Sequence, residues 1–273
     1  MTICAYATFD DRDGHDDERD LALEAWREAG IVGRVERWDD PAVDWSGYDA
    51  VVVRSVWDYI LRREEFLAWA RGVESVTRLL NPYSVLETNT NKTYLRDLDV
   101  PIVPTHWSSR DLPDWPEYVV KPAISGGARD TSRTSDRGEA RTLAASLEAE
   151  GRTPMIQPYL DMVESEGEIS LLYFNRRFSH AVRRNPMLAP GMTPADNVQA
   201  QLRSPAPDQV ELAEKVLAAV PTPLLYARID LVRLFDGTPA VMEVELTEPY
   251  LYLSHEPRAA ANLAQALGEL VRR

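Results

Sequence analysis

The sequence has few of the residues that form disulfides, thiolate metal sites or membrane spans. Its one cysteine, Cys4, excludes an internal disulfide and a cysteine metal site. Its four histidines have no metal-ligand spacing with one another. It has no signal peptide and no apolar run long enough to cross a membrane. We therefore expect a cytoplasmic protein in which Cys4 is buried and unreactive.

Basic residues are also fewer than acidic residues. The chain has 30 Lys and Arg residues against 44 Asp and Glu residues, which gives a net charge of −14 and a pI near 4.8. This balance argues against a nucleic-acid partner or an acidic membrane, although a local basic pocket stays compatible with it. At 273 residues the chain is long enough to bury a core and to divide into two or three lobes.

Lysine is especially scarce. Of the 30 basic residues only Lys92, Lys121 and Lys215 are lysine. Since arginine stands almost wherever either cation would serve, a lysine here indicates a need for a compact ammonium, as phosphate sites often have. Lys215 follows Glu211 by four residues in a helical run and is expected to form an ordinary surface ion pair. Lys92 and Lys121 are therefore the candidates for binding an anion.

Strands and helices alternate in the first part of the chain. Apolar strands are expected at 2–9, 32–38 and 48–54, and helices at 18–29 and 63–73. This alternation predicts a small parallel α/β lobe, in which ligands gather beyond the carboxyl ends of the strands. The residues placed near such a cleft are Asp10, Asp11, Arg54, Ser55, Trp57 and Asp58. The alternative for most of the acidic residues in 10–20 is that they belong to a solvated loop and the start of a helix and do not line a cleft.

The middle of the chain places both candidate lysines beside anion-binding features. Lys92 lies at the start of a helix predicted within 84–98, whose backbone donors would favour an anion. Lys121 ends an apolar strand at 118–122 and precedes a loop that contains Gly126 and Gly127. The backbone N–H groups of this loop are suited to covering phosphates, with a plain hairpin turn as the alternative. The order of residues is not that of a P-loop.

A proline interrupts the strand expected at 154–160. Pro158 has no N–H to donate, so the backbone groups of Gln157, Tyr159 and Leu160 are expected to be free for a ligand. Two further strands, 168–174 and 177–184, are joined at Asn175-Arg176. The long loop at 185–207 is expected to be disordered or to cover a site.

The stretch from Tyr226 to Leu253 carries the strongest functional pattern. Asp236-Gly237 predicts a turn between two strands with alternating apolar residues. Side chains two apart share a face, so Arg228 and Asp230 lie together on one strand, as do Glu243 and Glu245 on the other. Three carboxylates on one face would repel each other without a cation, and their oxygens suit Mg²⁺ that holds phosphate. A solvated polar face is the alternative.

This order of parts resembles the ATP-grasp superfamily over roughly 81–253. The family has a lysine before a helix, a lysine before a glycine-rich loop, a strand with a hinge, and an RID strand paired with an acid-x-acid strand. The hairpin looks like the metal strands of D-alanine–D-alanine ligase, and 157–170 looks like the hinge of glutathione synthetase. The segments EVELTEP and RSVWDY look closest to the branch that holds the D-cycloserine-forming cyclo-ligase.

The resemblance implies an α/β fold of the α+β ATP-grasp type. A small parallel α/β domain at 1–80 would precede a small lobe with a glycine-rich lid at 81–155. A C-terminal lobe with the metal strands would follow at 156–273. A homodimer is left open, and no nucleic acid or membrane is expected as a partner.

The resemblance also implies roles for single residues toward ATP and one or two Mg²⁺ ions. The ATP-binding residues would be Lys92, Lys121, Gln157, Pro158, Tyr159, Leu160 and Glu168. The metal ligands would be Asp230, Glu243 and Glu245. Arg228 would stabilise the phosphoryl group in transfer, and Gly126 and Gly127 would form the lid.

Two residues depart from the family pattern. Glu245 stands where the family usually has Asn, which leaves the number of metal ions open. Ser170 stands where glutathione synthetase has a basic residue, so another cation, Arg183 or Arg184, must serve.

A substrate carboxylate needs a cation that ATP does not use. Arg54 and Arg183 are expected to face each other across the cleft for this purpose, with Asp58 available to a substrate ammonium. Trp57 and Tyr250 would shape and close the pocket. The alternative for Arg54 is an internal ion pair with one of the N-terminal aspartates.

These parts predict an ATP-dependent ligase that joins a carboxylate to an amine through an acyl phosphate, either between two molecules or by closing a ring within one. Phosphoryl transfer needs mainly positioning and charge neutralisation, so no protein nucleophile is required. The alternatives are a kinase-like enzyme that stops at phosphoryl transfer and a non-catalytic nucleotide-binding module.

Overall fold

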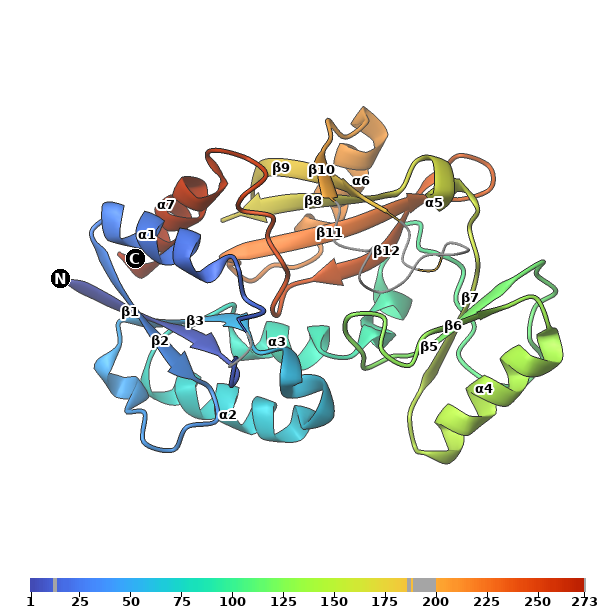
Figure 1. Cartoon of the computed structure of the whole chain (residues 1–273), viewed down its shortest axis with the longest axis horizontal. Coiled ribbons are helices and arrows are strands. Elements are labelled where there is room, and N and C mark those ends of the chain that lie inside the picture. Colours follow the sequence, from blue (N-terminus) through green and yellow to red (C-terminus); the bar gives the residue numbers. More distant parts are fainter. Residues whose placement is uncertain (12–13, 186–187, 189–199, 273) are drawn as a thin grey trace.

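The chain folds around three β-sheets, shown in Figure 1. This computed structural model describes residues 1–11, 14–185, 188 and 200–272. Most of the loop expected at 185–207 therefore lies outside the described residues. Within the described part of the chain, none of the helices has the length and apolar character needed to span a bilayer.

The first sheet is parallel, with the strand order β2-β1-β3-β4. Its strands are β1 (Thr2–Thr8), β2 (Ile31–Arg37), β3 (Ala50–Ser55) and β4 (Leu79–Leu80). The connecting helices are α1 (Arg19–Glu28) and α2 (Arg63–Val76), with short 3₁₀ turns η1 (Trp45–Gly47) and η2 (Trp57–Leu61). Gly30 follows α1 with a φ of +78°, a conformation that ends a helix easily when no Cβ is present. The predicted parallel α/β lobe is thus confirmed.

The second sheet is antiparallel and forms the centre of the molecule, with the order β10-β9-β8-β11-β12. Its strands are β8 (Glu168–Phe174), β9 (Arg177–Arg184), β10 (Ala200–Leu202), β11 (Tyr226–Arg233) and β12 (Pro239–Glu245). Three helices accompany it: α5 (Met162–Ser165), α6 (Pro207–Ala218) and α7 (Ala259–Val271). Because α6 packs on one face of β8 and α7 on the other, every residue of β8 is buried.

A small third sheet lies at one end of the molecule (Figure 1). It has the order β6-β5-β7, formed by β5 (Tyr118–Pro122), β6 (Ser132–Thr134) and β7 (Pro154–Pro158), with α4 (Arg137–Ala149) packed on it. The Asp136 side chain caps α4 by accepting hydrogen bonds from the N–H groups of Gly138 and Glu139. The domain boundary expected between 155 and 156 falls inside β7, and the division into three domains stays a prediction.

The segment between the first and third sheets packs against the central sheet. It contains α3 (Tyr83–Asn89) and the 3₁₀ helix η3 (Lys92–Asp97). The Tyr94 hydroxyl donates to the Val244 carbonyl at 2.8 Å, and Ile102 forms a parallel bridge with Val241. Lys92 thus stands at the start of a helix, as predicted, and Asn89 of α3 and Tyr94 of η3 both donate to β12.

The parallel sheet and the central sheet share one hydrophobic core. Cys4 and Trp26 belong to the same buried cluster as Leu172 and Leu263, which come from the other end of the chain. Figure 1 shows α1 and α7 next to each other, in agreement with this cluster. Cys4 is buried, as expected, and burial raises the pKa of its thiol to about 12.

A buried ion pair strengthens this junction. Glu18 accepts from the Arg54 guanidinium at 3.2 Å and from the backbone N–H groups of Leu251 and Leu253 at 2.7 Å each. Arg54 also donates to the Pro249 carbonyl at 3.1 Å. One carboxylate therefore ties the N-terminal sheet to the loop that follows β12.

We predict that Glu18→Ala lowers the free energy of unfolding by about 3–5 kcal/mol, because it leaves the Arg54 charge buried without its partner. Urea denaturation followed by circular dichroism measures this change. Glu24→Ala is the matched control, since Glu24 forms an exposed pair with Arg27 and its loss should change the stability far less. Equal losses in the two variants would contradict the importance given to the buried pair.

Candidate active site

Residues of the second and third sheets and of the η2 turn after β3 surround one cavity of about 650 Å³. Its walls include side chains that follow β3, the loop after β5, the end of β7, and the strands β8, β9, β11 and β12. The charged residues that line it are Lys92, Lys121, Glu168, Arg184, Arg228, Glu243, Glu245 and Glu248. The cavity therefore contains an unusual density of both charges, as a site for a charged ligand requires.

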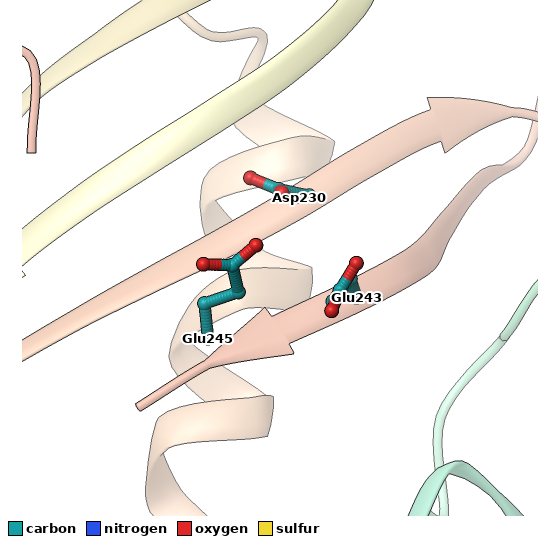
Figure 2. Close-up of side chains that lie close together, drawn as sticks. All are labelled: Asp230, Glu243 and Glu245. Carbon is teal, nitrogen blue, oxygen red and sulfur yellow. The ribbon is translucent and has the colours of Figure 1, made fainter. Parts of the chain in front are cut away.

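The hairpin of β11 and β12 brings three carboxylates together, as predicted. Asp230 stands opposite Glu243 in the ladder, and Arg228 stands opposite Glu245. One oxygen from each of Asp230, Glu243 and Glu245 lies within 4.8 Å of the others. Figure 2 shows the three side chains projecting from the two strands toward a common space. These hard oxygen donors fit Mg²⁺.

Basic side chains of the chain itself neutralise these acids. Arg228 donates to both oxygens of Asp230, at 2.9 Å to each, and pairs with Glu245. Arg184 reaches Asp230 from β9 at 2.8 Å, and Lys92 lies 3.1 Å from Glu243. Burial raises the pKa of Asp230, but the charges of Arg184 and Arg228 outweigh burial and hold it below its usual range.

Both candidate lysines line the cavity, in different surroundings. Burial lowers the pKa of Lys92, but the charge of Glu243 outweighs it and raises the pKa above the usual value. Burial lowers the pKa of Lys121, and Glu243 only partly opposes this. In the described part of the chain, Lys121 has no ion pair in its ligand-free state. Lys121 therefore offers the more available ammonium. Lys215 forms the expected surface pair with Glu211 at 2.8 Å.

The backbone donors expected beside Lys92 are already used. The Lys92 N–H donates to the Ala123 carbonyl at 2.9 Å, and the Thr93 N–H donates to the Asn91 side chain at 3.1 Å. The expectation that this helix start offers free donors to an anion is wrong, because a tight 3₁₀ turn is capped by its own Asn91. Only the ammonium of Lys92 remains to meet a ligand.

Three of the five expected substrate residues do not line the cavity. Arg54 is buried in its ion pair with Glu18, so the alternative of an internal pair is correct, with a glutamate in place of an aspartate. Asp58 accepts from Trp38 and pairs with Arg62 on the far side of η2. Trp57 and Tyr250 do line the cavity.

Arg183 also points away from the cavity. Its guanidinium donates to the carbonyls of Ser165 and Glu166 and to the side chain of Asn185. Neighbouring residues of a strand face opposite sides, so Arg184 faces the cavity instead. Arg184 pairs with Glu168 at 2.7 Å as well as with Asp230. Of the two arginines expected to serve in place of the basic residue that Ser170 replaces, Arg184 is therefore the better placed.

Comparison with known proteins identifies the family. A family model described as the N-terminal domain of the D-cycloserine synthetase DcsG matches residues 4–81. The cycloserine biosynthesis protein DcsG of Streptomyces lavendulae is 38% identical over 274 residues, which cover 90% of this chain and 91% of that protein. The chain is an ATP-grasp ligase of the D-cycloserine synthetase branch. It is thus an enzyme that forms a C–N bond with consumption of ATP, as the sequence predicted.

Solved structures agree with this assignment. The crystal structure of D-cycloserine synthetase DcsG superposes with a TM-score of 0.90 at 35% identity, over 98% of this chain and 99% of that one. D-alanine–D-alanine ligase from Bacillus anthracis, solved with ATP, gives a TM-score of 0.64 at 14% identity over 100% of this chain and 98% of that one. The second likeness shows the shared ATP-grasp fold.

The four residues expected to form a hinge line the cavity: Gln157, Pro158, Tyr159 and Leu160. The backbone groups beside Pro158 were expected to be free, but not all of them are. The Tyr159 N–H donates to the Glu117 carbonyl at 3.0 Å, and the Gln157 side chain donates to Thr105 at 2.8 Å. The expectation of free groups beside Pro158 is wrong for Tyr159, because pairing with β5 continues one residue past the proline.

The glycine-rich loop and Glu168 border the same cavity. Gly126 and Gly127 line it, and Gly127 has a φ of +58° that favours glycine. Glu168 follows Gly167, where a Cβ would lie 2.5 Å from the Arg184 carbonyl, so glycine is required for β8 and β9 to approach. Burial raises the pKa of Glu168 despite the opposing charge of Arg184.

Sequence reasoning missed Tyr59 and Glu248, which both line the cavity. Glu248 lies in the segment EVELTEP, three residues after Glu245, so its position beyond the metal strand was the available signal. Burial, followed by the charge of Glu245, raises the pKa of Glu248 to about 8. Burial likewise raises the pKa of Glu245 to about 7, although Arg228 opposes it.

We predict that Glu248→Gln stabilises the ligand-free protein increasingly as the pH rises from 5 to 8. The Glu248 pKa is raised from 4.5 to about 8 on folding, so in this range the folded protein holds a proton that the unfolded chain has released. The parent therefore loses stability as pH rises, whereas glutamine does not titrate. Melting temperatures of both proteins at pH 5, 6, 7 and 8 test this, and a difference that stays constant with pH would contradict it.

Proposed function

We propose that the ligase transfers the γ-phosphoryl group of ATP to the carboxylate of a small amino-acid-like substrate, and that a nitrogen then attacks the acyl phosphate. The observation that carries this proposal is the shared cavity of the carboxylate triad, Arg228 and the two lysines. A carboxylate is a poor acyl donor until its oxygen becomes a phosphate leaving group. The amide-type bond forms as phosphate leaves, so ADP and phosphate are both released.

The residues at the lid side of the cavity are assigned to ATP. Lys92 and Lys121 would contact its phosphates, and Gly126 and Gly127 would cover them. The hinge residues Gln157, Pro158, Tyr159 and Leu160 would face adenine, and Glu168 would accept from the ribose hydroxyls. These roles are supported by the lining of the cavity. The two lysines, the two glycines, the four hinge residues and Glu168 all border one cavity next to the carboxylates.

Asp230, Glu243 and Glu245 would hold Mg²⁺ together with the ATP phosphates. The separation of their oxygens and their hard donor character fit this ion. Bound there, Mg²⁺ neutralises phosphate charge and orients the phosphoryl group. Arg228 is buried, and Asp230 and the Tyr250 carbonyl, at 3.1 Å, hold its guanidinium in place. Its positive charge would therefore be fixed beside the phosphoryl group, where negative charge develops during transfer.

A ring-closing reaction is the form of ligation that we favour. The relative at 38% identity is named for the biosynthesis of cycloserine, a cyclic product, and spans nearly the whole chain. In a ring closure the nitrogen and the carboxylate belong to one molecule, so the pocket must hold only one small substrate beside ATP. Trp57 and Tyr250 border the cavity and are assigned to this substrate.

The experiment that tests the function is a screen for ATP-dependent phosphate release with pools of amino acids and their derivatives. Mass spectrometry of active pools then looks for a product that has lost water relative to its substrate. Such a product supports ring closure. A stable phosphorylated product would instead establish a kinase-like reaction, and no release from any pool would count against the proposal.

We predict that Glu243→Gln lowers ADP formation by on the order of 100-fold or more while the fold is retained. The change removes one charged ligand from the proposed Mg²⁺ site and leaves the side-chain shape nearly unchanged. Coupled-enzyme assays measure ADP, and circular dichroism checks the fold. Glu211→Gln, a surface change on α6, serves as the control. Turnover by Glu243→Gln near that of the control would remove Glu243 from the metal site.

We predict that Lys121→Ala weakens ATP binding by about 1.5–3 kcal/mol, the range for a charge-assisted contact. Isothermal titration calorimetry with a non-hydrolysable ATP analogue measures this loss. Lys215→Ala removes the same side chain from an exposed pair and should leave the affinity unchanged. If both variants bind with the parent affinity, the phosphate role of Lys121 is wrong.

A further inference from the structure

The carboxylates that line the cavity differ in how their charge is balanced. Glu243 pairs with Lys92, Glu245 with Arg228, and Glu168 with Arg184. Among the described residues, Glu248 is the one cavity-lining carboxylate that has no ion pair within 4.0 Å. Of these four carboxylates, Glu248 is therefore the one whose ionised form would be balanced by an incoming cation.

Glu248 does not belong to the metal triad. The cluster of carboxylate oxygens within 4.8 Å of one another contains Asp230, Glu243 and Glu245 and leaves Glu248 out. Glu248 follows Glu245 by three residues, and both line the same cavity. Trp57 and Tyr250, which are assigned to the substrate, line this cavity too, and the Trp57 indole N–H reaches the Glu248 carbonyl.

The backbone at Glu248 is fixed on both sides. The Trp57 indole N–H donates to the Glu248 carbonyl at 3.3 Å, and Arg54 donates to the next carbonyl, that of Pro249. Two residues earlier, the Leu246 N–H donates to the Asn89 side chain at 2.8 Å. Three different segments therefore hold this short stretch, so the backbone position of Glu248 is built into the fold.

Aromatic side chains surround this carboxylate. Trp57, Tyr59 and Tyr250 line the cavity with it. Apolar walls lower the local dielectric, so a cation beside Glu248 is attracted more strongly than in water. These aromatic side chains carry no positive charge, so they cannot balance the charge of an ionised Glu248 themselves.

We propose that Glu248 binds the ammonium group of the amino-acid substrate, whose carboxylate lies at the neighbouring metal end of the cavity. This inference rests on the proposed function and adds to it that the substrate keeps a free, charged amine. In an α-amino acid both groups sit on one carbon, which fits a cavity that Glu248 and Glu245 both line. Asp58, which the sequence suggested for this ammonium, is occupied by Arg62.

The pKa of Glu248 is compatible with this contact. In the ligand-free cavity burial raises it to about 8, and an ammonium beside the carboxylate favours its ionised form. Ionisation of Glu248 is costly in the buried cavity, and the ammonium group of a bound substrate balances the negative charge that ionisation creates.

The test uses D-cycloserine, the compound for which the relative is named, and isoxazolidin-3-one, the same ring without the amine. Calorimetry in the presence of ADP and Mg²⁺ measures the affinity of each ring for the parent and for Glu248→Gln. We expect the parent to bind D-cycloserine at least about 10-fold more tightly than the ring without the amine. In Glu248→Gln this preference should disappear, with the affinity for ADP and Mg²⁺ unchanged. Glu211→Gln should behave as the parent.

Two results would overturn the inference. One is a preference for the amine that Glu248→Gln retains, because another group would then bind the ammonium. The other is loss of ADP and Mg²⁺ binding in Glu248→Gln, which would place Glu248 in the nucleotide site. Phosphate release by the parent in the amino-acid screen is measured separately. An active parent together with either result therefore contradicts the ammonium contact alone and leaves the proposed function standing.

Discussion

The charge ladder across β11 and β12 is the interaction on which the site depends. Arg228 is buried and joins Asp230 on its own strand to Glu245 on the next one. A buried charge costs several kcal/mol unless it is paired, so this arrangement is tolerated only in the observed register. A slip of one strand by one residue would turn the two charged side chains of that strand toward the opposite face, into the core below α6. Strand register and site chemistry are therefore specified by the same residues.

The sequence predicted those parts of the site that follow from a period of two. Asp230, Glu243 and Glu245 could be placed on one face because alternation in a hairpin needs no knowledge of distant segments. The same reasoning could not choose between Arg183 and Arg184, since they are adjacent and only the pairing of Arg184 with Glu168 decides which one faces the cavity. Local pattern thus gives the spacing along a strand, while tertiary packing decides which face is used.

Other parts depend on contacts between segments far apart in the chain. Arg54 does lie near the end of an apolar strand, but its buried partner Glu18 belongs to a run of acids that looked solvated in the sequence. Helix α7, which was not predicted, completes a core begun by Trp26 some 230 residues earlier. Composition and periodicity do not encode such partners, because any buried apolar face would satisfy the same pattern. The fold class and the order of strands were accessible, whereas the junction between the sheets was not.

The way in which Glu18 holds the loop after β12 has a consequence for divergence among related enzymes. Glu18 accepts from the backbone N–H groups of Leu251 and Leu253 and makes no use of their side chains in these bonds. Every residue except proline supplies the same donor, so the loop can exchange side chains without losing its attachment to the N-terminal sheet. Tyr250, whose side chain borders the cavity, lies in this attached stretch. A fixed backbone with interchangeable side chains is an arrangement in which substrate preference can drift while the charged residues of β11 and β12 stay in place.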